Sequence, residues 1–289
     1  MTETNLQQYL NAFKAEEHQP FVLAGGEHAA LLIHGFPGSP AEMRPIANSL
    51  NTAGWTVSVP LLPGFGPQVE TLADRKKSEW LDAVQTTYDD LRKQHETVVL
   101  IGNSFGAALS IELAATTRQS PDSLVLLSPF WKLSHIAWQA MPVIQLLFPK
   151  PKIFKYLNLD FDDPEVRTGI HNFMPGLDLD DPAAQQAIRE FPVPVRMFGE
   201  IYKAGKAGYH HAPEVHVPVL ILQGRHDEIS QPHLTKKLAS RFSAPVHYYE
   251  VNTEHNLTDT EHPDWPLIER YINQFLARLT ERPSDRMQI

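Results

Sequence analysis

A serine between two glycines is the feature of this sequence with the clearest chemical meaning. The motif Gly-Asn-Ser-Phe-Gly at residues 102–106 follows the apolar run Val98–Ile101 and precedes small residues that begin at Ala107. In this pattern the serine occupies a sharp turn from strand to helix, which holds its hydroxyl clear of the backbone. The glycines are needed because a Cβ at either position would collide with neighbouring atoms. The motif therefore predicts that Ser104 is a displayed nucleophile.

Two later loops offer the partners that such a serine needs. A serine hydroxyl is a poor nucleophile unless a base removes its proton and a carboxylate orients that base. Asp227 lies in the loop after the apolar run Val219–Leu222, and His255 lies in the loop after the run Val246–Val251. Both loops leave predicted strands at the edge where open α/β sheets bind ligands. The sequence therefore predicts Ser104, Asp227 and His255 as a catalytic group.

The acid and the base each have a rival nearby. Glu228 follows Asp227 and is an alternative orienting acid, since either type of carboxylate serves that role. Of the histidines, only His255 and His262 fall after the last predicted strand. His262 precedes Pro263 at a predicted helix start, where capping is its ordinary use. Position therefore favours Asp227 as the acid and His255 as the base.

Acyl transfer also needs hydrogen-bond donors for the negative charge that develops on the substrate oxygen. We expect one donor to be the amide of Phe105, the residue after the predicted nucleophile. The other is expected from the turn His-Gly-Phe-Pro-Gly at residues 34–38, through the amide of Phe36. His34 in this turn is interpreted as a packing and hydrogen-bonding residue rather than a second base.

The segments between these residues alternate apolar runs typical of strands with stretches typical of helices. Runs that are apolar on both faces and joined by helices indicate an α/β fold with a mainly parallel sheet flanked by helices. The predicted strands are Ala29–Ile33, Thr56–Val59, Val98–Ile101, Leu124–Leu127, Val219–Leu222 and Val246–Val251. The predicted helices are Pro40–Ala53, Ser78–Gln94, Ala107–Arg118, Pro232–Phe242 and Pro263–Leu279, after a short amphipathic segment at Leu6–Phe13.

The alternation is interrupted between about Phe130 and His216, in a segment rich in proline and aromatic residues. Asp163-Pro164 and Asp181-Pro182 are each typical of a helix start. A segment this long must carry structure of its own or serve as a lid. We expect a core domain at residues 1–129 and 217–289, with a helical cap at 130–216 inserted before the penultimate strand. The aromatic residues of the cap fit a pocket wall and ordinary packing equally well.

Composition limits the classes of partner. The 289 residues include 34 acidic and 25 basic side chains, a formal charge of −9, which disfavours binding to nucleic acid or anionic membranes. There is no cysteine, which excludes disulfides, thiolate zinc sites and cysteine nucleophiles. The first residues lack the pattern of a signal peptide, and the apolar stretch Ile136–Phe148 is too short to span a membrane. We expect a cytoplasmic protein without stable membrane anchoring.

Two groups of side chains have the composition of metal ligands without the spacing. The histidines at 210, 211 and 216, with Glu214, fit no strong zinc pattern. The aspartates within residues 160–163 and 178–181 lack the spaced ligands and turn glycine of a calcium loop, and helix starts explain them better. We therefore expect no metal and no cofactor.

These motifs together resemble the α/β-hydrolase superfamily, and within it the bacterial carboxylesterases and monoacylglycerol lipases of the thermostable-esterase type. The resemblance covers roughly residues 28–280 and is strongest at residues 34–40, 102–106, 223–228 and 255–258. It implies the α/β-hydrolase fold. The residues that it implies as functional are Ser104, Asp227 and His255 for the catalytic triad, and Phe36 and Phe105 for the oxyanion hole.

One position departs from that family. A histidine often stands between the two glycines where this chain has Gly64-Phe65-Gly66. Any binding role of that histidine is therefore missing, and we expect Phe65 to line an apolar wall.

The implied activity is that of a serine hydrolase that cleaves carboxylic esters through an acyl-enzyme on Ser104. Short to medium acyl chains or a monoglyceride-like substrate are expected. Hydrolysis of amide, thioester or C–C bonds stays open, whereas a dehalogenase or epoxide hydrolase would place a carboxylate where Ser104 stands. A catalytically silent ligand-binding protein is the alternative from another class, but binding alone gives no reason for all three triad residues.

Overall fold

A seven-stranded sheet forms the centre of the computed structural model, which describes residues 16–133, 159–163, 166, 167, 170, 178–190 and 195–280. The strands are β1 (Phe21–Leu23), β2 (His28–Ile33), β3 (Thr56–Val59), β4 (Thr97–Asn103), β5 (Ser123–Leu127), β6 (Val219–Gly224) and β7 (Val246–Val251). Their order is β1-β3-β2-β4-β5-β6-β7. Only β1 runs antiparallel to its neighbour, β3, and the other neighbouring pairs are parallel. The predicted mainly parallel sheet and its six strands are confirmed, and β1 is an addition.

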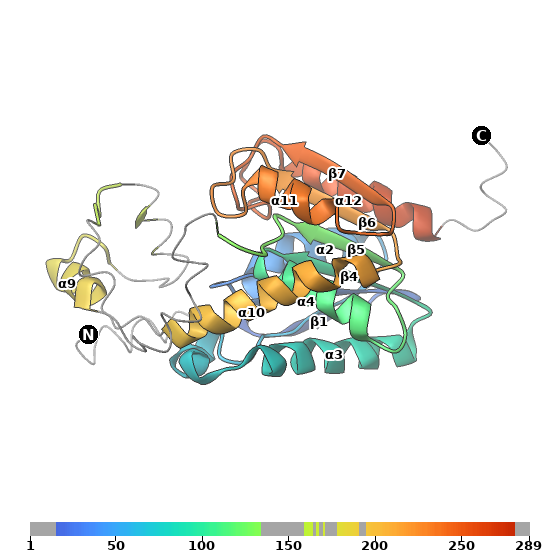
Figure 1. The fold of residues 1–289 in the computed structure, drawn as a ribbon, viewed down its shortest axis with the longest axis horizontal. Helices are drawn as coiled ribbons and strands as arrows, with labels where there is room; N and C mark the ends of the chain where they lie inside the picture. Colours follow the sequence, from blue (N-terminus) through green and yellow to red (C-terminus); the bar gives the residue numbers. More distant parts are fainter. Residues whose placement is uncertain are drawn as a thin grey trace.

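Alternate residues of the central strands point into two separate cores. Leu31 of β2 and Leu100 of β4 belong to one buried cluster, whereas Leu32 and Ile101 belong to the other. This is the period of two expected of a strand whose two faces are both covered. Helices must therefore lie on both sides of the sheet, as Figure 1 shows.

Apart from α9 (Pro182–Glu190), the α-helices divide between these two faces. The α-helices are α2 (Arg44–Thr52), α3 (Lys77–Gln94), α4 (Phe105–Thr116), α9 (Pro182–Glu190), α10 (Val195–His211), α11 (Pro232–Ala239) and α12 (Trp265–Thr280). The short 3₁₀ segments are η1 (Glu16–His18), η2 (Pro40–Met43), η3 (Gly66–Asp74) and η4 (Ala212–Glu214). Helices α3, α4, α10 and α11 contribute to the first core, and α2 and α12 contribute to the second. Every predicted helix of the core is present, with ends shifted by a few residues.

Helix α10 packs across α4, although the sequence placed it in the inserted segment. Met197, Ile201 and Ala204 of α10 are buried in the first core. The two helices approach closely at Gly208, where a Cβ would lie 2.9 Å from the carbonyl oxygen of Ala108. Helix α10 thus brings the return of the inserted segment next to the helix that begins at the nucleophile motif. The division into core and cap stays a prediction.

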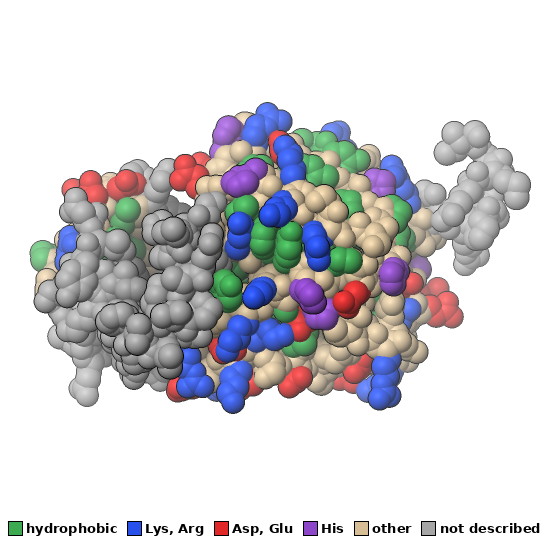
Figure 2. Space-filling model, viewed as in Figure 1, with side chains coloured by type: hydrophobic (Ala, Val, Ile, Leu, Met, Phe, Trp, Pro, Cys, Tyr) green, Lys and Arg blue, Asp and Glu red, His purple; other side chains and the backbone are tan. Residues whose placement is uncertain are grey.

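Aromatic stacking joins the chain after β5 to α10. The rings of Trp131 and Tyr209 are stacked with centroids 4.0 Å apart, and the Trp131 Nε1–H donates to the carbonyl of Leu234 in α11. Lys237 lies over the Trp131 ring and Arg241 over the Tyr209 ring. Figure 2 shows blue Lys and Arg side chains gathered over α10 and α11 on this face. This face is therefore rich in basic side chains, although the net charge of the whole chain is negative.

Several predicted features fall outside the described residues. These are the amphipathic segment Leu6–Phe13, the apolar stretch Ile136–Phe148 and Pro164. The predicted helix start at Asp181-Pro182 is present as the start of α9. Among the described residues, no helix is long and apolar enough to cross a membrane.

Candidate active site

Ser104 occupies a strained turn between β4 and α4. Its φ of 49° and ψ of −110° lie outside the regions that non-glycine residues ordinarily adopt. A Cβ on Gly102 would lie 2.5 Å from Ser110 Oγ, and a Cβ on Gly106 would collide with the carbonyl oxygen of Ile33. The backbone N–H of Ser104 donates to a carbonyl of β5 at 2.8 Å, which helps to hold the strained residue. The sharp turn predicted from the two glycines is present.

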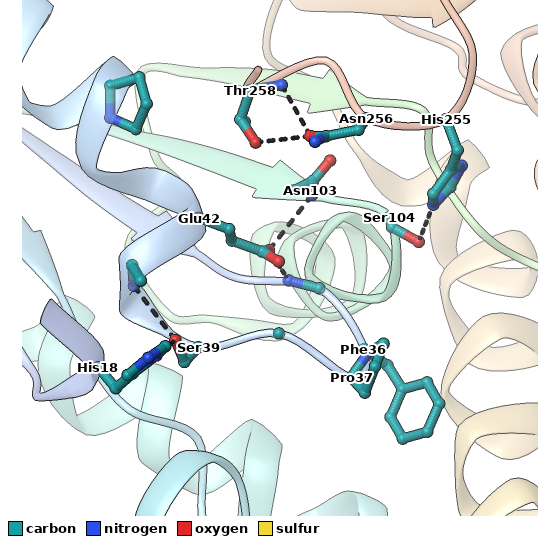
Figure 3. A pocket seen from close by; sticks show the side chains of 14 residues that line it. His18, Phe36, Pro37, Ser39, Glu42, Asn103, Ser104, His255, Asn256 and Thr258 are labelled. Atoms are coloured by element: carbon teal, nitrogen blue, oxygen red, sulfur yellow. Dashed lines mark hydrogen bonds between the residues drawn. The ribbon is translucent and has the colours of Figure 1, made fainter. Parts of the chain in front are cut away.

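The structure brings Ser104, His255 and Asp227 into one hydrogen-bonded chain. His255 Nε2 lies 2.9 Å from Ser104 Oγ (Figure 3), and His255 Nδ1 lies 2.8 Å from Asp227 Oδ2. An ionised carboxylate can only accept a hydrogen bond, so Nδ1 carries the proton and Nε2 accepts from the serine hydroxyl. The arrangement places a base on the serine and an acid behind the base.

Asp227 is buried, with 2 % of its surface exposed, and its carboxylate is fully hydrogen-bonded. Oδ1 accepts from the backbone N–H groups of Ile229 and Ser230, and Oδ2 accepts from Gln223 Nε2 as well as from His255. Burial alone would raise the pKa of this carboxyl, but these donors together hold the pKa below its ordinary value. Asp227 is therefore ionised at neutral pH and fixed in orientation.

Glu228 and His262, the alternatives for the acid and the base, do not take those positions in the hydrogen-bonded chain. Glu228 is exposed, and the acid that contacts His255 is Asp227. His262 Nδ1 accepts a hydrogen bond from the backbone N–H of Asp264 at 3.1 Å, just before α12 begins. This is the capping use expected from the sequence.

His34 anchors the turn at residues 34–38. It is fully buried, with Nδ1 3.0 Å from the Gly35 carbonyl and Nε2 3.1 Å from the backbone N of Leu62. Since the Leu62 N–H is a donor, Nε2 must accept and Nδ1 must carry the proton. Burial lowers the pKa of His34 to about 4, so the ring is neutral at physiological pH. His34 therefore packs and hydrogen-bonds, in agreement with its interpretation from the sequence.

Phe36 lies in the turn after β2 and Phe105 is the first residue of α4, and both line a cavity together with Ser104. Phe65 lies behind both, with ring centroids 6.1 Å from Phe36 and 6.1 Å from Phe105. Phe65 is 1 % exposed and belongs to the first core. It therefore supports the two turns from behind and lines neither of the cavities described below.

Two cavities meet at Ser104 and His255. One, of about 310 Å³, is apolar and is lined by Phe36, Pro37, Ser104, Phe105, Phe130, Leu133, Phe198, Ile201, Ile229 and His255. The other, of about 350 Å³, has many polar side chains and is lined by His18, Gly35, Phe36, Pro37, Gly38, Ser39, Ala41, Glu42, Pro45, Asn103, Ser104, His255, Asn256 and Thr258. The same serine and histidine thus face an apolar space on one side and a polar space on the other.

Sequence reasoning missed Glu42, which lies in the wall of the polar cavity. It stands in η2, and its carboxylate accepts hydrogen bonds from the Gly35 N–H and from Asn103 Nδ2. The signal in the sequence was weak, because a glutamate in the first turn of a helix is ordinary. Only the fold shows that this carboxylate lies between two loops of the site.

The described residues do not form a metal site. No group of three or more histidine, aspartate or glutamate side chains among them is arranged to hold an ion. His211 Nδ1 instead contacts Glu214 at 2.8 Å. Asp160 and Asp178 each accept a hydrogen bond from the backbone N–H two residues later, as at turns.

Comparisons with known proteins show what this chain is similar to. The profile of the family described as "Serine aminopeptidase, S33" matches residues 27–257. Over 96 residues the chain is 35 % identical to a thermostable monoacylglycerol lipase of Bacillus sp. (strain H-257), which is 33 % of this chain and 38 % of that protein. Over 99 residues it is 33 % identical to a carboxylesterase of Bacillus subtilis (strain 168), which is 34 % of this chain and 40 % of that protein. The chain thus matches about two fifths of the length of each relative.

Solved structures extend the similarity to nearly the whole chain. A structure reported for LipS and LipT, two metagenome-derived lipolytic enzymes, has a TM-score of 0.68 at 20 % identity, covering 91 % of this chain and 98 % of the other. The monoacylglycerol lipase of Paleococcus ferrophilus has a TM-score of 0.64 at 19 % identity, covering 89 % and 97 %. At these identities the structures show a shared fold.

Proposed function

The chain belongs to the serine aminopeptidase S33 family of α/β-hydrolases, and from that premise we propose that it hydrolyses carboxylic esters through an acyl-enzyme on Ser104. The observation that carries the proposal is the chain of hydrogen bonds from Ser104 through His255 to Asp227, at 2.9 and 2.8 Å. The partial sequence similarity of this protein to a monoacylglycerol lipase and a carboxylesterase supports an ester as the substrate.

In the proposed reaction His255 acts first as a base and then as an acid. Nε2 takes the hydroxyl proton of Ser104 while Oγ forms a bond to the ester carbonyl carbon. The tetrahedral intermediate breaks its bond to the alcohol oxygen, which leaves with the proton from Nε2. Water then attacks the acyl-enzyme in the same way and releases the acid. Asp227 stays ionised throughout and stabilises the imidazolium.

The negative oxygen of the intermediate is proposed to lie between the backbone N–H groups of Phe36 and Phe105. Phe105 is the first residue of α4, so its N–H also belongs to the positive end of the helix dipole. One such donor is worth about 10²–10³ in rate. Neither donor depends on its own side chain.

The two cavities are proposed to divide the substrate. The apolar cavity of about 310 Å³ would hold the acyl chain, which suits short to medium lengths. The polar cavity of about 350 Å³ would hold a hydroxylated leaving alcohol such as the glycerol part of a monoglyceride. Phe130, Leu133, Phe198 and Ile201 reach the apolar cavity from the segment at residues 130–216, which we propose acts as a cap over the site.

The proposal is tested by hydrolysis of p-nitrophenyl esters from acetyl to palmitoyl, with the wild type and Ser104→Ala compared. We expect the wild type to be most active on esters in the range from acetyl through octanoyl. The variant should lose nearly all turnover while it keeps its melting temperature. Substantial residual activity in Ser104→Ala would place the nucleophile elsewhere.

A catalytically silent binding protein is distinguished by a second measurement. Fluorophosphonates label only activated serines, so labelling of the wild type and not of Ser104→Ala would support the triad. A labelled protein without activity on any ester would direct the search to amide, thioester or C–C substrates.

A further inference from the structure

Glu42 connects the two turns that carry the proposed oxyanion donors. Its Oε1 accepts hydrogen bonds from the backbone N–H of Gly35 and from Nδ2 of Asn103, the second at 3.2 Å (Figure 3). Gly35 directly precedes Phe36, and Asn103 directly precedes Ser104. One carboxylate oxygen therefore contacts the turn after β2 and the turn after β4 at once.

The turn after β2 is shaped around this carboxylate. A Cβ on Gly38 would collide with the carboxylate of Glu42. A Cβ on Gly35 would lie 3.3 Å from Glu42 Oε1 and 3.3 Å from the Cβ of Ser104. Real Cβ atoms rarely pack so tightly against neighbours. Glycine at both positions therefore leaves room for the carboxylate between the turns. The positions of Glu42 and of the two turns are therefore coupled.

The side chain of Asn103 is also oriented by Glu42. Asn103 is 7 % exposed, and its buried Oδ1 has no hydrogen-bond partner among the described residues. Leaving a buried amide oxygen unpaired is costly. The hydrogen bond from Nδ2 to Glu42 is the described contact that fixes this amide, which gives a reason for an asparagine before the nucleophile.

We propose that Glu42 is a positioning residue that holds the turn at residues 34–38 against the nucleophile turn and so sets the spacing of the Phe36 and Phe105 N–H groups. The inference rests on the proposed function. A donor stabilises the oxyanion only when it lies about 2.7–3.1 Å from that oxygen. A shift of the turn by a fraction of an ångström would therefore slow the chemical step without removing any group that binds the substrate.

The charge of Glu42 and its role as an acceptor can be separated. Burial raises the pKa of the Glu42 carboxyl, while the hydrogen bonds from Gly35 and Asn103 and the nearby His255 oppose this rise. The two hydrogen bonds need an oxygen acceptor rather than a charge. A glutamine at this position keeps such an oxygen, whereas an alanine removes it.

The experiment compares Glu42→Ala, Glu42→Gln and the control Glu96→Ala with p-nitrophenyl butyrate as substrate. Glu96 is an exposed carboxylate just before β4, at the opposite end of that strand from Asn103. We expect Glu42→Ala to lower kcat by about 10- to 100-fold, within the effect of one oxyanion donor, with KM changed less than about threefold. Glu42→Gln should stay within about threefold of the wild type, and Glu96→Ala should equal it.

Three outcomes in the Glu42 variants would overturn the proposal. An unchanged kcat in Glu42→Ala would show that the contact positions nothing. A loss confined to KM would make Glu42 a binding group, and equal losses in the alanine and glutamine variants would assign the effect to charge. If Glu42→Ala melts below the assay temperature, Asn103→Ala removes one of the two contacts and must lower kcat in the same way. An unchanged kcat there also contradicts the proposal.

Labelling by a fluorophosphonate separates failure of this inference from failure of the proposed function. The labelling rate of Ser104 depends on the same N–H donors but needs no ester. A wild type that is labelled and cleaves no ester would refute the proposed substrate class. The positioning role would then be tested by labelling rates alone: the rate should fall in Glu42→Ala and stay unchanged in Glu42→Gln. A wild type that is not labelled would refute both.

Discussion

At the scale of single residues, the site depends on which protonation state each buried group is held in. Asp227 accepts four hydrogen bonds and stays ionised, and His34 is held neutral between a carbonyl and an N–H. The donors around Asp227 hold it ionised against the effect of burial, whereas burial itself holds His34 neutral. Substitutions that change one proton without changing shape are therefore the most informative tests at this scale.

Asp227→Asn is expected to lower kcat by up to about 10⁴-fold, because the amide favours the wrong tautomer of His255. The melting temperature should fall as well, because the amide nitrogen cannot accept the two hydrogen bonds that one carboxylate oxygen accepts. The exposed neighbour gives a matched control in Glu228→Gln, which should keep full activity. A near-normal rate in Asp227→Asn, with a loss in Glu228→Gln, would transfer the acid role to Glu228.

His34 should make the protein less stable as the pH falls below 6.5. Its pKa is 6.5 when unperturbed and about 4 in the fold, so between these values the unfolded chain binds a proton that the folded chain does not. The contribution is complete above 6.5 and is lost progressively down to about 4. From these two pKa values, the loss between pH 7 and pH 5 is about 2 kcal/mol.

Urea unfolding at pH 7 and pH 5 measures this loss. His34→Gln should lose about 2 kcal/mol less between the two pH values than the wild type does. His233→Gln, at an exposed position of α11, controls for removal of a histidine. Identical pH dependence in the wild type and His34→Gln would refute the assignment.

The residues with chemistry were largely predictable, and the residues that position them were not. Ser104 and His255 stand in motifs whose spacing has a mechanical reason, so the sequence alone placed them at one sheet edge. Asp227 and Glu228 are adjacent and chemically alike, and only the orientation of the loop after β6 separates them. Glu42 has no motif, because its role depends on glycines and an asparagine that the fold brings to it.

At the scale of elements, long apolar runs predicted strands well and short or edge elements poorly. Strand β2 is apolar from Ala29 to Ile33 and strand β4 from Val98 to Ile101, since both faces are covered there. Strand β1 has three residues, none of them buried, and Val22 is 64 % exposed. An edge strand this short has no period to detect, and its pairing with β3 comes from tertiary contacts.

A buried ionic network at the start of α3 fixes α10 to the core. Lys77 Nζ pairs with Glu112 of α4, and the Lys77 backbone N–H donates to Glu200 of α10 at 2.9 Å. Glu112 and Glu200 are 5 % and 7 % exposed. Glu200 lies next to Ile201 and two residues from Phe198, which line the apolar cavity. The network therefore sets the place of that cavity wall.

Lys77→Met should lower the free energy of unfolding by roughly 2–4 kcal/mol, because it leaves the buried Glu112 carboxylate without its partner. Lys93→Met on the same helix is the matched control, since Lys93 and Asp90 are 71 % and 61 % exposed and solvent screens such a surface pair. Chemical denaturation of both variants measures the difference. Equal losses would show that the Lys77 pair contributes no more than a surface pair.

At the scale of the whole molecule, the parallel sheet gathers residues that are far apart in the chain. The ends of β4, β6 and β7 lie at one edge, so Ser104, Asp227 and His255 meet although 151 residues separate the first from the last. The two cavities then lie on either side of this point. The sheet edge was predictable from the strand pattern, whereas the cavity walls were not, because the helical spacing of the buried residues of α10 does not tell which helix they pack against.

Helix α10 supplies part of the wall of the apolar cavity. Phe198 contacts Phe36 with ring centroids 5.9 Å apart and lines the apolar cavity of about 310 Å³. Phe198→Ala should lengthen this cavity away from Ser104 and leave the triad in place. Each additional buried methylene of an acyl chain is worth about 0.8 kcal/mol, so two to four of them should raise kcat/KM for octanoyl or decanoyl relative to butyryl esters by about tenfold or more.

The control for this change is Phe275→Ala, which removes the same side chain from the second core, where Phe275 is 7 % exposed and far from the cavity. It should lose stability, as large-to-small core substitutions do, and keep the chain-length preference of the wild type. A p-nitrophenyl ester series measured on both variants decides the matter. An unchanged preference in Phe198→Ala would mean that the acyl chain lies in the polar cavity instead, and the assignment of the two sides of Ser104 would have to be reversed.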